Sequence, residues 1–554
     1  MRGNATLAGN CDRRSTWYRR AAAFCAMLAV AMVFRADALT DWDSWDYASQ
    51  AMLGQPSDLA LGRWWFIAAL RAMYAIGHGL FGVARLDGYL AMQIGCSIVM
   101  ALALVALMAW THRLTRSTAA EVIVAALVLP GPMIGIYASS VMTEGLAVLM
   151  ITCAFLAWDK VSTIADCGLR IADSPGTGCG GIGEDPANPK SEIRNPKSTT
   201  SARRIAPFLW ALTAGLCLGV AIDIREPAIL LGAWPVISCL ADRPQHRWRL
   251  LILMAAGAAI ALGIGVAGAW AWYPWSKGYL GNMHEWLGKM AAERTQFPPS
   301  VLENLGLIGL FLAIATPLPA VLALPSIIWA LLRRRRLFWL AVSVLPYLAS
   351  LAVNHDLSVN PRFIIPAAWL LSPVAAAAVD AWLVGRRRWQ SLRLGVAAAL
   401  VIGLGGAGLV AGWGEIQRTH FDYSNSQARM LRVMLKLPDD TAVIPGPGGT
   451  PVAGYLNRLG VKHFSIVRSG WDWPGDKLGE VISGHLAAGR RVFIDLDEKD
   501  WTRTLRKNDE FEALLAAIDR GRFRQVAASE STWPLTELLP PTPASRPATL
   551  RLEP

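Results

Sequence analysis

The chain has 554 residues, of which 54% are hydrophobic and only 17% are charged. A soluble globular protein carries about 25% charged residues, so this composition excludes an ordinary soluble protein. The net charge of +12 does not indicate nucleic-acid binding, because the basic residues lie in short segments between long apolar runs. That arrangement is typical of cytoplasmic anchors in a membrane protein. The 8 cysteines form no C-x-x-C pair, so the sequence predicts neither a disulfide framework nor a zinc site.

The N-terminus combines a basic segment, with four arginines between Arg13 and Arg20, and an apolar run over 21–34. We interpret 1–20 as a cytoplasmic N-terminus and the apolar run as the first membrane span. A cleaved signal peptide is the alternative, because Ala36-Asp37-Ala38 fits the small-x-small pattern, although charged Arg35 and Asp37 make it a poor cleavage site. In both cases Leu39 onward emerges on the outer face.

Further apolar runs bring the predicted total to about eleven transmembrane helices. They lie at roughly 88–110, 119–138, 141–158, 207–223, 226–241, 250–272, 305–332, 337–353, 363–384 and 393–412. Arginine-rich loops follow alternate spans and fall on the side of the N-terminus, in agreement with the positive-inside rule. The outer face then receives 35–87, 273–304, 354–362 and everything after about 413.

Three segments stand apart from the spans. Residues 63–84 are apolar but contain Arg71 and His78, so we predict an interfacial amphipathic helix. Residues 159–206 are rich in Gly, Pro, Ser and charge, with Asn-Pro-Lys-Ser repeated, and we predict a disordered cytoplasmic insert. Residues 413–554 are predicted to form a small extracytoplasmic α/β domain, with strands at 441–444, 464–467 and 492–496 and helices at 451–459 and 478–488. The predicted fold class is therefore a mainly α, polytopic membrane protein, with its membrane part at 21–412.

The densest polar cluster of the outer face is the run from Thr40 to Tyr47, which contains Asp41, Asp43 and Asp46. Carboxylates this close repel one another unless they bind a cation or one of them is held for acid–base work. Asp41 and Asp43 are the candidate metal ligands, and the identity of any metal stays open. The alternative is a solvated acidic loop whose tryptophans belong to an interfacial aromatic belt.

A second cluster lies at the mouth of two adjacent predicted spans and contains His355, Asp356 and Arg362. An arginine at that depth suits a phosphate or pyrophosphate, which it grips in bidentate fashion. We therefore take Arg362 and His355 as candidate phosphate-binding residues. The alternative is an arginine that reaches out to lipid headgroups.

Two further ionisable sites lie at predicted span ends. Asp223-Ile224-Arg225-Glu226-Pro227 forms the turn between two spans, and Glu144 begins a span near the outer face. Ionisable groups at membrane depth are functional candidates by default. The alternative for the first site is a structural ion pair between Arg225 and Glu226.

Nucleotide and metalloprotease motifs are absent from the sequence. The glycine-rich run at 445–449 lacks the Lys-Ser/Thr of a P-loop, and His284-Glu285 does not extend to H-E-x-x-H. Any energy for a reaction is therefore expected from an activated substrate and not from bound ATP.

These motifs, taken in order, resemble those of the GT-C membrane glycosyltransferases, especially the protein O-mannosyltransferase-like and aminoarabinose-transferase-like enzymes. The resemblance rests on the acidic first loop, Thr143-Glu144, the G-x-x-x-G and R-x-P elements of 215–227, and Pro361-Arg362-Phe363 with Pro366. It covers roughly 20–385. The family often has an Asp-Glu or Glu-x-Asp pair in the first loop, so here the choice among the three aspartates stays open.

The resemblance implies a polyprenyl-phosphate-linked sugar as donor and transfer at the outer face to a lipid, glycan or protein. A first-loop aspartate would activate the acceptor, while Arg362 or Arg225 would stabilise the leaving phosphate. The outer loop 273–304, which contains His284, could close over the donor. A transporter or flippase is the main alternative, although no internal repeat supports it. A non-catalytic envelope scaffold is the third possibility, but it leaves the acidic cluster unexplained.

Overall fold

The computed structural model describes residues 3–39, 42–54, 63–172, 197–242, 246–272, 300–316, 319–355, 360–384, 416–467, 477–496, 509–521, 523–527 and 535–540, together with isolated positions between them. The chain divides into two compact units. Unit 1 comprises Met1–Arg35, Gly54–Val83 and Leu90–Gly414, and unit 2 comprises Ala36–Leu53, Ala84–Tyr89 and Glu415–Pro554.

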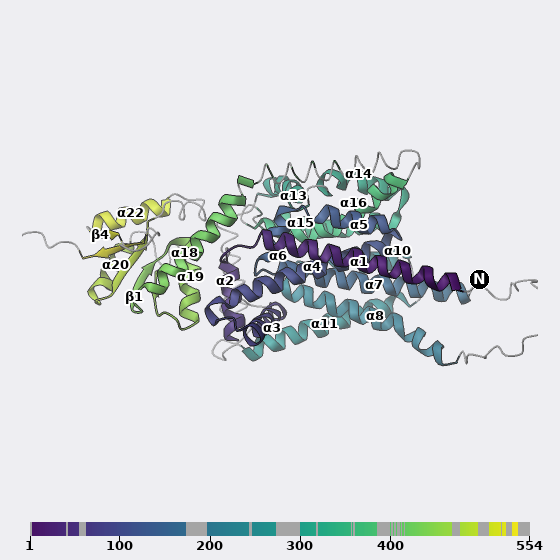
Figure 1. Cartoon of the computed structure of the whole chain (residues 1–554), viewed down its shortest axis with the longest axis horizontal. Helices are drawn as coiled ribbons and strands as arrows, with labels where there is room; N and C mark the ends of the chain where they lie inside the picture. Colours follow the sequence, from purple (N-terminus) through teal and green to yellow (C-terminus); the bar gives the residue numbers. More distant parts are fainter. Residues whose placement is uncertain are drawn as a thin grey trace, which may run out of the picture. The chain divides into compact units, whose positions relative to one another are not determined.

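Unit 1 is a bundle of helices that lie alongside one another (Figure 1). Its helices are α1 (Gly3–Val33), α3 (Trp64–Phe81), α4 (Gly88–Thr115), α5 (Thr118–Val128), α6 (Pro132–Ser139), α7 (Glu144–Ala172), α8 (Lys197–Ile224), α9 (Ala228–Leu231), α10 (Ala233–Asp242), α11 (Arg247–Trp272), α13 (Val301–Ala315), α14 (Pro319–Arg333), α15 (Arg335–Asn354), the 3-10 turn η2 (Pro361–Ile364) and α16 (Ile365–Val384). Among the described residues, five helices are long and apolar enough to cross a membrane. Two of the other apolar helices, α5 and α6, become a sixth span if they are counted together. The chain is thus a multi-pass membrane protein, while the predicted total of about eleven spans stays a prediction.

Several predicted spans are interrupted in the structure. The run at 119–138 forms α5 and α6, which meet at an angle of 78°, and the run at 226–241 is divided between α9 and α10. The run at 305–332 is divided between α13 and α14, with Thr316 outside both helices. Hydropathy does not report bends, but Pro130-Gly131-Pro132 was a visible signal for the first break.

The predicted insert at 159–206 is shorter than expected. Helix α7 runs to Ala172 and α8 begins at Lys197, so both edges of that segment are helical. Residues 173–196 lie outside the described residues. The apolar runs before and after the segment thus continue as helix into polar sequence, which composition alone did not indicate.

Close packing of α8 with α11 depends on glycine. A Cβ atom added to Gly215 or Gly219 of α8 would lie 2.0 or 2.4 Å from a backbone carbonyl oxygen of α11. In return, a Cβ at Gly257 of α11 would lie 2.4 Å from the Leu212 carbonyl oxygen. The G-x-x-x-G element of the sequence therefore has a packing role, which is how small residues act between helices in membranes.

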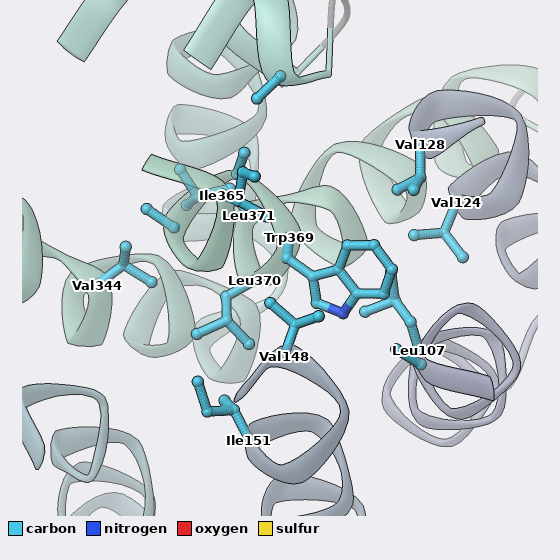
Figure 2. Packing of buried hydrophobic residues seen from close by; sticks show 14 of the residues in the cluster. Leu107, Val124, Val128, Val148, Ile151, Val344, Ile365, Trp369, Leu370 and Leu371 are labelled. Carbon is cyan, nitrogen blue, oxygen red and sulfur yellow. The ribbon is translucent and has the colours of Figure 1, made fainter. Parts of the chain in front are cut away.

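The core of unit 1 surrounds Trp369 of α16, which is fully buried. Figure 2 shows its indole among side chains of several helices, including Leu107, Val124 and Val148. The indole nitrogen donates a hydrogen bond to Thr152 Oγ1 at 3.1 Å, so the one polar atom of this side chain is satisfied inside the core. The core thereby fixes α16 against α7, and both helices begin at the candidate site.

Helix α3 occupies most of the segment predicted as an interfacial helix. Its N-terminus is held by Asp223 of α8, whose Oδ2 accepts a hydrogen bond from the Trp65 amide at 3.0 Å. The Trp65 indole donates to the Ala261 carbonyl of α11 at 2.9 Å. A carboxylate at a helix N-terminus is electrostatically favourable, which explains why Asp223 is buried here.

Unit 2 contains a five-stranded sheet in the order β2-β1-β3-β5-β4. The strands are β1 (Thr441–Ile444), β2 (Ser465–Ile466), β3 (Arg491–Asp495), β4 (Arg524–Ala527) and β5 (Leu535–Leu539), of which β1, β2 and β3 are parallel and β5 is antiparallel to its neighbours. The helices are α2 (Trp42–Leu53), the 3-10 turn η1 (Arg85–Asp87), α18 (Tyr423–Lys436), α19 (Gly446–Arg458), α20 (Leu478–Ala487) and α22 (Asp509–Gly521). Strands β1 to β3 and helices α19 and α20 lie close to the positions that alternating patterns predict.

We expect Gly257→Ala to lower the thermal unfolding midpoint of the detergent-solubilised protein. The added methyl group meets backbone of α8, which cannot move aside, so overpacking should cost about 1–3 kcal/mol. Gly263→Ala on the same helix is the control, because nothing lies within 4 Å of its added Cβ. Equal midpoints for the two variants would show that the α8–α11 contact does not depend on glycine.

Candidate functional site

Three ionisable side chains from three separate sequence motifs meet inside unit 1. Arg225 Nη1 donates to Glu144 Oε1 at 2.5 Å, and Arg362 Nε lies 3.5 Å from the same oxygen. Glu144 begins α7, Arg225 follows the end of α8, and Arg362 lies in the turn η2 before α16. The ends of three helices therefore bring together residues that are up to 218 positions apart in the chain (from 144 to 362).

The cluster is deeply buried. The side chain of Glu144 is 0% exposed, that of Arg225 5% and that of Arg362 10%. Two guanidinium groups approach the same carboxylate oxygen of Glu144. Guanidinium groups held together in this way can also bind an anionic group such as a phosphate.

Phe363 lies at the centre of the cluster. The guanidinium carbon of Arg225 is 4.2 Å from the centroid of the Phe363 ring, and that of Arg362 is 5.6 Å from it. The His355 ring meets Phe363 edge-on, with centroids 4.6 Å apart. An aromatic face attracts cations and restricts the planes of the guanidinium groups, so the ring orients the groups that would bind an anion.

Neighbouring side chains hold the two turns that carry these residues. The Tyr347 hydroxyl of α15 donates to the Phe363 carbonyl at 2.7 Å. Asn304 of α13 donates to the carbonyls of Ala352 and His355 at 2.9 and 2.7 Å, and its own carbonyl accepts from the Leu357 amide. Both side chains are buried, so the turns are fixed from inside the bundle.

One polar atom each of Arg225 and Glu144 has no hydrogen-bond partner within the part of the chain that the structure describes. These atoms are Nη2 of Arg225 and Oε2 of Glu144, and both are buried. Leaving a charged donor such as Nη2 unpaired is expensive, which makes it a candidate to bind an anionic group.

Two carboxylates of the first loop, Asp43 and Asp46, lie in unit 2 and are part of helix α2. Asp43 is half-buried in the first turn of the helix. Asp46 is buried and forms an ion pair with Arg458, and its other oxygen accepts from Gln50 at 2.6 Å. The alternative interpretation, a solvated acidic loop, therefore does not hold for Asp46, because the helix turns this residue inward.

The remaining predicted site residues have varied positions. Arg225 pairs with Glu144, whereas Glu226 is exposed, so the partner differs from that of the alternative interpretation, an Arg225–Glu226 ion pair. Asp41, Asp356 and His284 lie outside the described residues. Among the described residues, no group of three or more His, Cys, Asp or Glu side chains is placed to hold a metal ion.

Sequence reasoning missed the roles of Tyr347, Asn304 and Arg458. Tyr347 is a polar residue within the predicted apolar span 337–353, and that was the available signal for it. Asn304 is the last residue of the predicted outer loop 273–304, where a polar residue gives no signal. The sequence contained no signal for the role of Arg458, because this arginine is one of many charged residues in a polar segment.

No protein-family model matches the sequence, and a search of curated proteins gives no match. Solved structures do match. The apo crystal structure of the Archaeoglobus fulgidus oligosaccharyltransferase aligns with a TM-score of 0.52 and 11% identity, over 94% of this chain and 74% of that one. A structure of the archaeal oligosaccharyltransferase AglB from the same organism, in complex with an inhibitory peptide and a dolichol-phosphate, aligns with a TM-score of 0.46 and 10% identity, over 94% and 74%. The chain thus has a GT-C-like fold, the fold of a class of membrane glycosyltransferases.

We expect Glu144→Gln to destabilise the protein strongly. The substitution removes the charge that pairs with the buried guanidinium group of Arg225, and breaking a buried ion pair in this way costs on the order of 3–5 kcal/mol. Thermal unfolding in detergent measures the effect. Glu226→Gln is the control, since it removes an exposed carboxylate beside the same arginine in the chain. A greater loss for Glu226→Gln would contradict the assigned pairing.

Proposed function

We propose that the chain is an integral membrane glycosyltransferase that transfers a sugar from a polyprenyl-phosphate-linked donor to an acceptor on the outer face of the membrane. The main support for the proposal is a buried cluster in which Arg225 and Arg362 both contact Glu144, on a GT-C-like fold. The acceptor would be a lipid, a glycan or a protein. The protein would reside in the inner (plasma) membrane, with its N-terminus in the cytoplasm.

The arginines would bind the phosphate of the donor. Arg362 has the larger exposed share of the two, so it would meet the phosphate first, while Nη2 of Arg225 would supply a second donor group. Guanidinium groups bind phosphate oxygens through paired, charge-assisted hydrogen bonds. Negative charge grows on that phosphate as the sugar leaves, and preorganised positive charge at a developing anion is often the largest catalytic contribution.

A first-loop carboxylate would activate the acceptor. Its oxygen or nitrogen nucleophile attacks the anomeric carbon, the bond from that carbon to the phosphate oxygen breaks, and the electron pair leaves with the polyprenyl phosphate. The proton of the nucleophile passes to the carboxylate. Because Asp43 is half-buried whereas Asp46 is buried, Asp43 is the preferred carboxylate, with Asp41 as the other candidate. A divalent metal held by Asp41 and Asp43 is a possible addition to this scheme.

A flippase or transporter is the second candidate function. The observation that favours it is the sharp bend between α5 and α6, because transporters use broken helices to build their binding sites. The two functions differ in product. A transferase consumes the labelled lipid-linked sugar and labels an acceptor, whereas a flippase moves the intact lipid to the other leaflet.

We expect membranes that contain the protein to transfer radiolabel from one member of a panel of polyprenyl-phosphate sugars. In that assay Asp43→Asn should lower kcat by about 10²-fold, the usual contribution of a positioned acid–base group. Arg362→Ala should raise the KM for the donor and lower kcat, with kcat/KM reduced about 10- to 100-fold, as expected for a lost charged hydrogen bond. Arg362→Lys should restore only part of the lost kcat/KM, because the lysine ammonium is a point charge and lacks the paired N–H groups of the guanidinium.

The control is Arg429→Ala, which removes an exposed arginine whose guanidinium bonds only weakly, at 3.4 Å, to the Asn425 carbonyl of its own helix. Wild-type kinetics for Arg362→Ala, or transfer to no acceptor while intact labelled lipid changes leaflet, would contradict the proposal.

Topology is tested separately. Because arginine-rich loops remain in the cytoplasm, we expect alkaline phosphatase fused after Pro554 to be active and the same enzyme fused after Arg335 to be inactive. Immunoblots control for expression of both fusions. Activity at Arg335 would place the helix ends that carry Arg225 and Arg362 on the cytoplasmic side and exclude transfer at the outer face.

A further inference from the structure

Three segments that are distant in sequence combine in unit 2. Residues 36–53 contain helix α2, residues 84–89 contain the turn η1, and the third segment is the part of the chain after 415. Helix α2 packs against α19, the helix that follows the first strand of the sheet. The part of the chain after 415 therefore packs directly against the helix that carries Asp43.

An ion pair joins the two helices. Arg458, the last residue of α19, pairs with Asp46 Oδ1 and also donates to Ser49 Oγ at 3.1 Å. Asp46 is 6% exposed, whereas the Arg458 side chain is 38% exposed. The carboxylate is thus the buried partner, and Arg458 supplies a counter-charge to it.

Aromatic side chains support the same contact. Trp45 is almost fully buried and meets the Tyr455 ring of α19 edge-on, with centroids 4.8 Å apart. The Tyr455 hydroxyl donates to the Leu86 carbonyl of η1 at 2.8 Å. One residue of α19 therefore holds both α2 and the 84–89 segment.

A third contact holds the chain just before α2. The Ala38 amide donates a hydrogen bond to Ser424 Oγ at 2.9 Å. The Ser424 hydroxyl in turn donates to the Ala38 carbonyl oxygen at 3.2 Å. Both residues are buried. Asp43 thus lies between two points at which the part of the chain after 415 holds the first loop.

We propose that Arg458 is a positioning residue, which fixes helix α2 so that Asp43 presents its carboxylate to the acceptor. This inference rests on the proposed function. Asp43 and Asp46 are three residues apart and therefore lie near each other on one side of the helix, one turn from each other. Holding Asp46 fixes the rotation of α2 about its axis, and with it the direction of Asp43.

The pairing also explains why two neighbouring aspartates can share one side of α2. Like charges at this spacing destabilise a helix. Arg458 offsets the charge of Asp46 and so reduces the repulsion between the two carboxylates. A loss of Arg458 should therefore disturb the helix and misplace Asp43 without removing any group that contacts the substrate.

The first test measures the position of α2 directly. In the full-length protein in detergent, Arg458→Ala should increase hydrogen exchange of peptides that cover 42–53. Arg491→Ala is the matched control, because it removes an exposed arginine of the same unit that pairs with Glu537 at 2.6 and 2.8 Å, away from α2. Unchanged exchange in α2 for Arg458→Ala would overturn the inference.

The second test measures turnover with the polyprenyl-phosphate sugar that gives the highest rate in the panel. Arg458→Ala should lower kcat about 10- to 100-fold, because a small misplacement of a catalytic group can have that effect, and should leave the donor KM within about twofold. Arg458→Lys should restore part of kcat, since it keeps the charge. In an Asp43→Asn background, Arg458→Ala should cause no further loss.

Each outcome decides a separate question. An equal loss in the wild-type and Asp43→Asn backgrounds would show that Arg458 acts independently of Asp43 and would overturn the positioning role. Wild-type turnover of Asp43→Asn would overturn the proposed role of Asp43 itself. A large loss for Asp43→Asn with none for Arg458→Ala or Arg458→Lys would leave the proposed function intact and reject only the inference about Arg458.

Discussion

Two guanidinium groups are buried among apolar helices with a single carboxylate between them, and the rest of unit 1 is organised around that constraint. Glu144, Arg225 and Arg362 must meet at one place, so α7 must begin, α8 must end and α16 must begin there. The cost of burying such charges is high unless the geometry is held closely. Core packing around Trp369 and the hydrogen bonds from Tyr347 and Asn304 provide that geometry.

Helix α8 connects this cluster to the rest of the bundle. Its glycines allow backbone contact with α11, and its Asp223, two residues before Arg225, accepts a hydrogen bond from the N-terminus of α3. A shift of α8 along its axis would therefore disturb the helix packing, the α3 docking and the Arg225–Glu144 pair together. Couplings of this kind are expected in a close-packed interior, which transmits displacement instead of absorbing it. The site is preorganised by the same contacts that make the fold.

The sequence predicted the uninterrupted helices and much of the candidate site, and the failures have physical causes. Apolar run length identified the helices near 88–110, 207–223 and 363–384, but hydropathy does not report a bend such as that between α5 and α6. Charge at membrane depth indicated Arg225, Arg362 and Glu144 as candidates, yet their pairing depends on contacts between distant segments. The three first-loop aspartates looked equivalent in sequence. Only the helical rotation of α2 and the position of Arg458 distinguish Asp46 from Asp43.

The central claim is that the buried arginine cluster binds the phosphate of a lipid-linked sugar. The most direct measurement is an electron cryomicroscopy structure of the full-length protein in a lipid nanodisc with added polyprenyl phosphate. Our account predicts phosphate density within about 3 Å of the guanidinium groups of Arg225 and Arg362, the usual distance of a charge-assisted hydrogen bond. Phosphate density at another place, with the Glu144–Arg225–Arg362 cluster unchanged and unoccupied at saturating lipid, would contradict it.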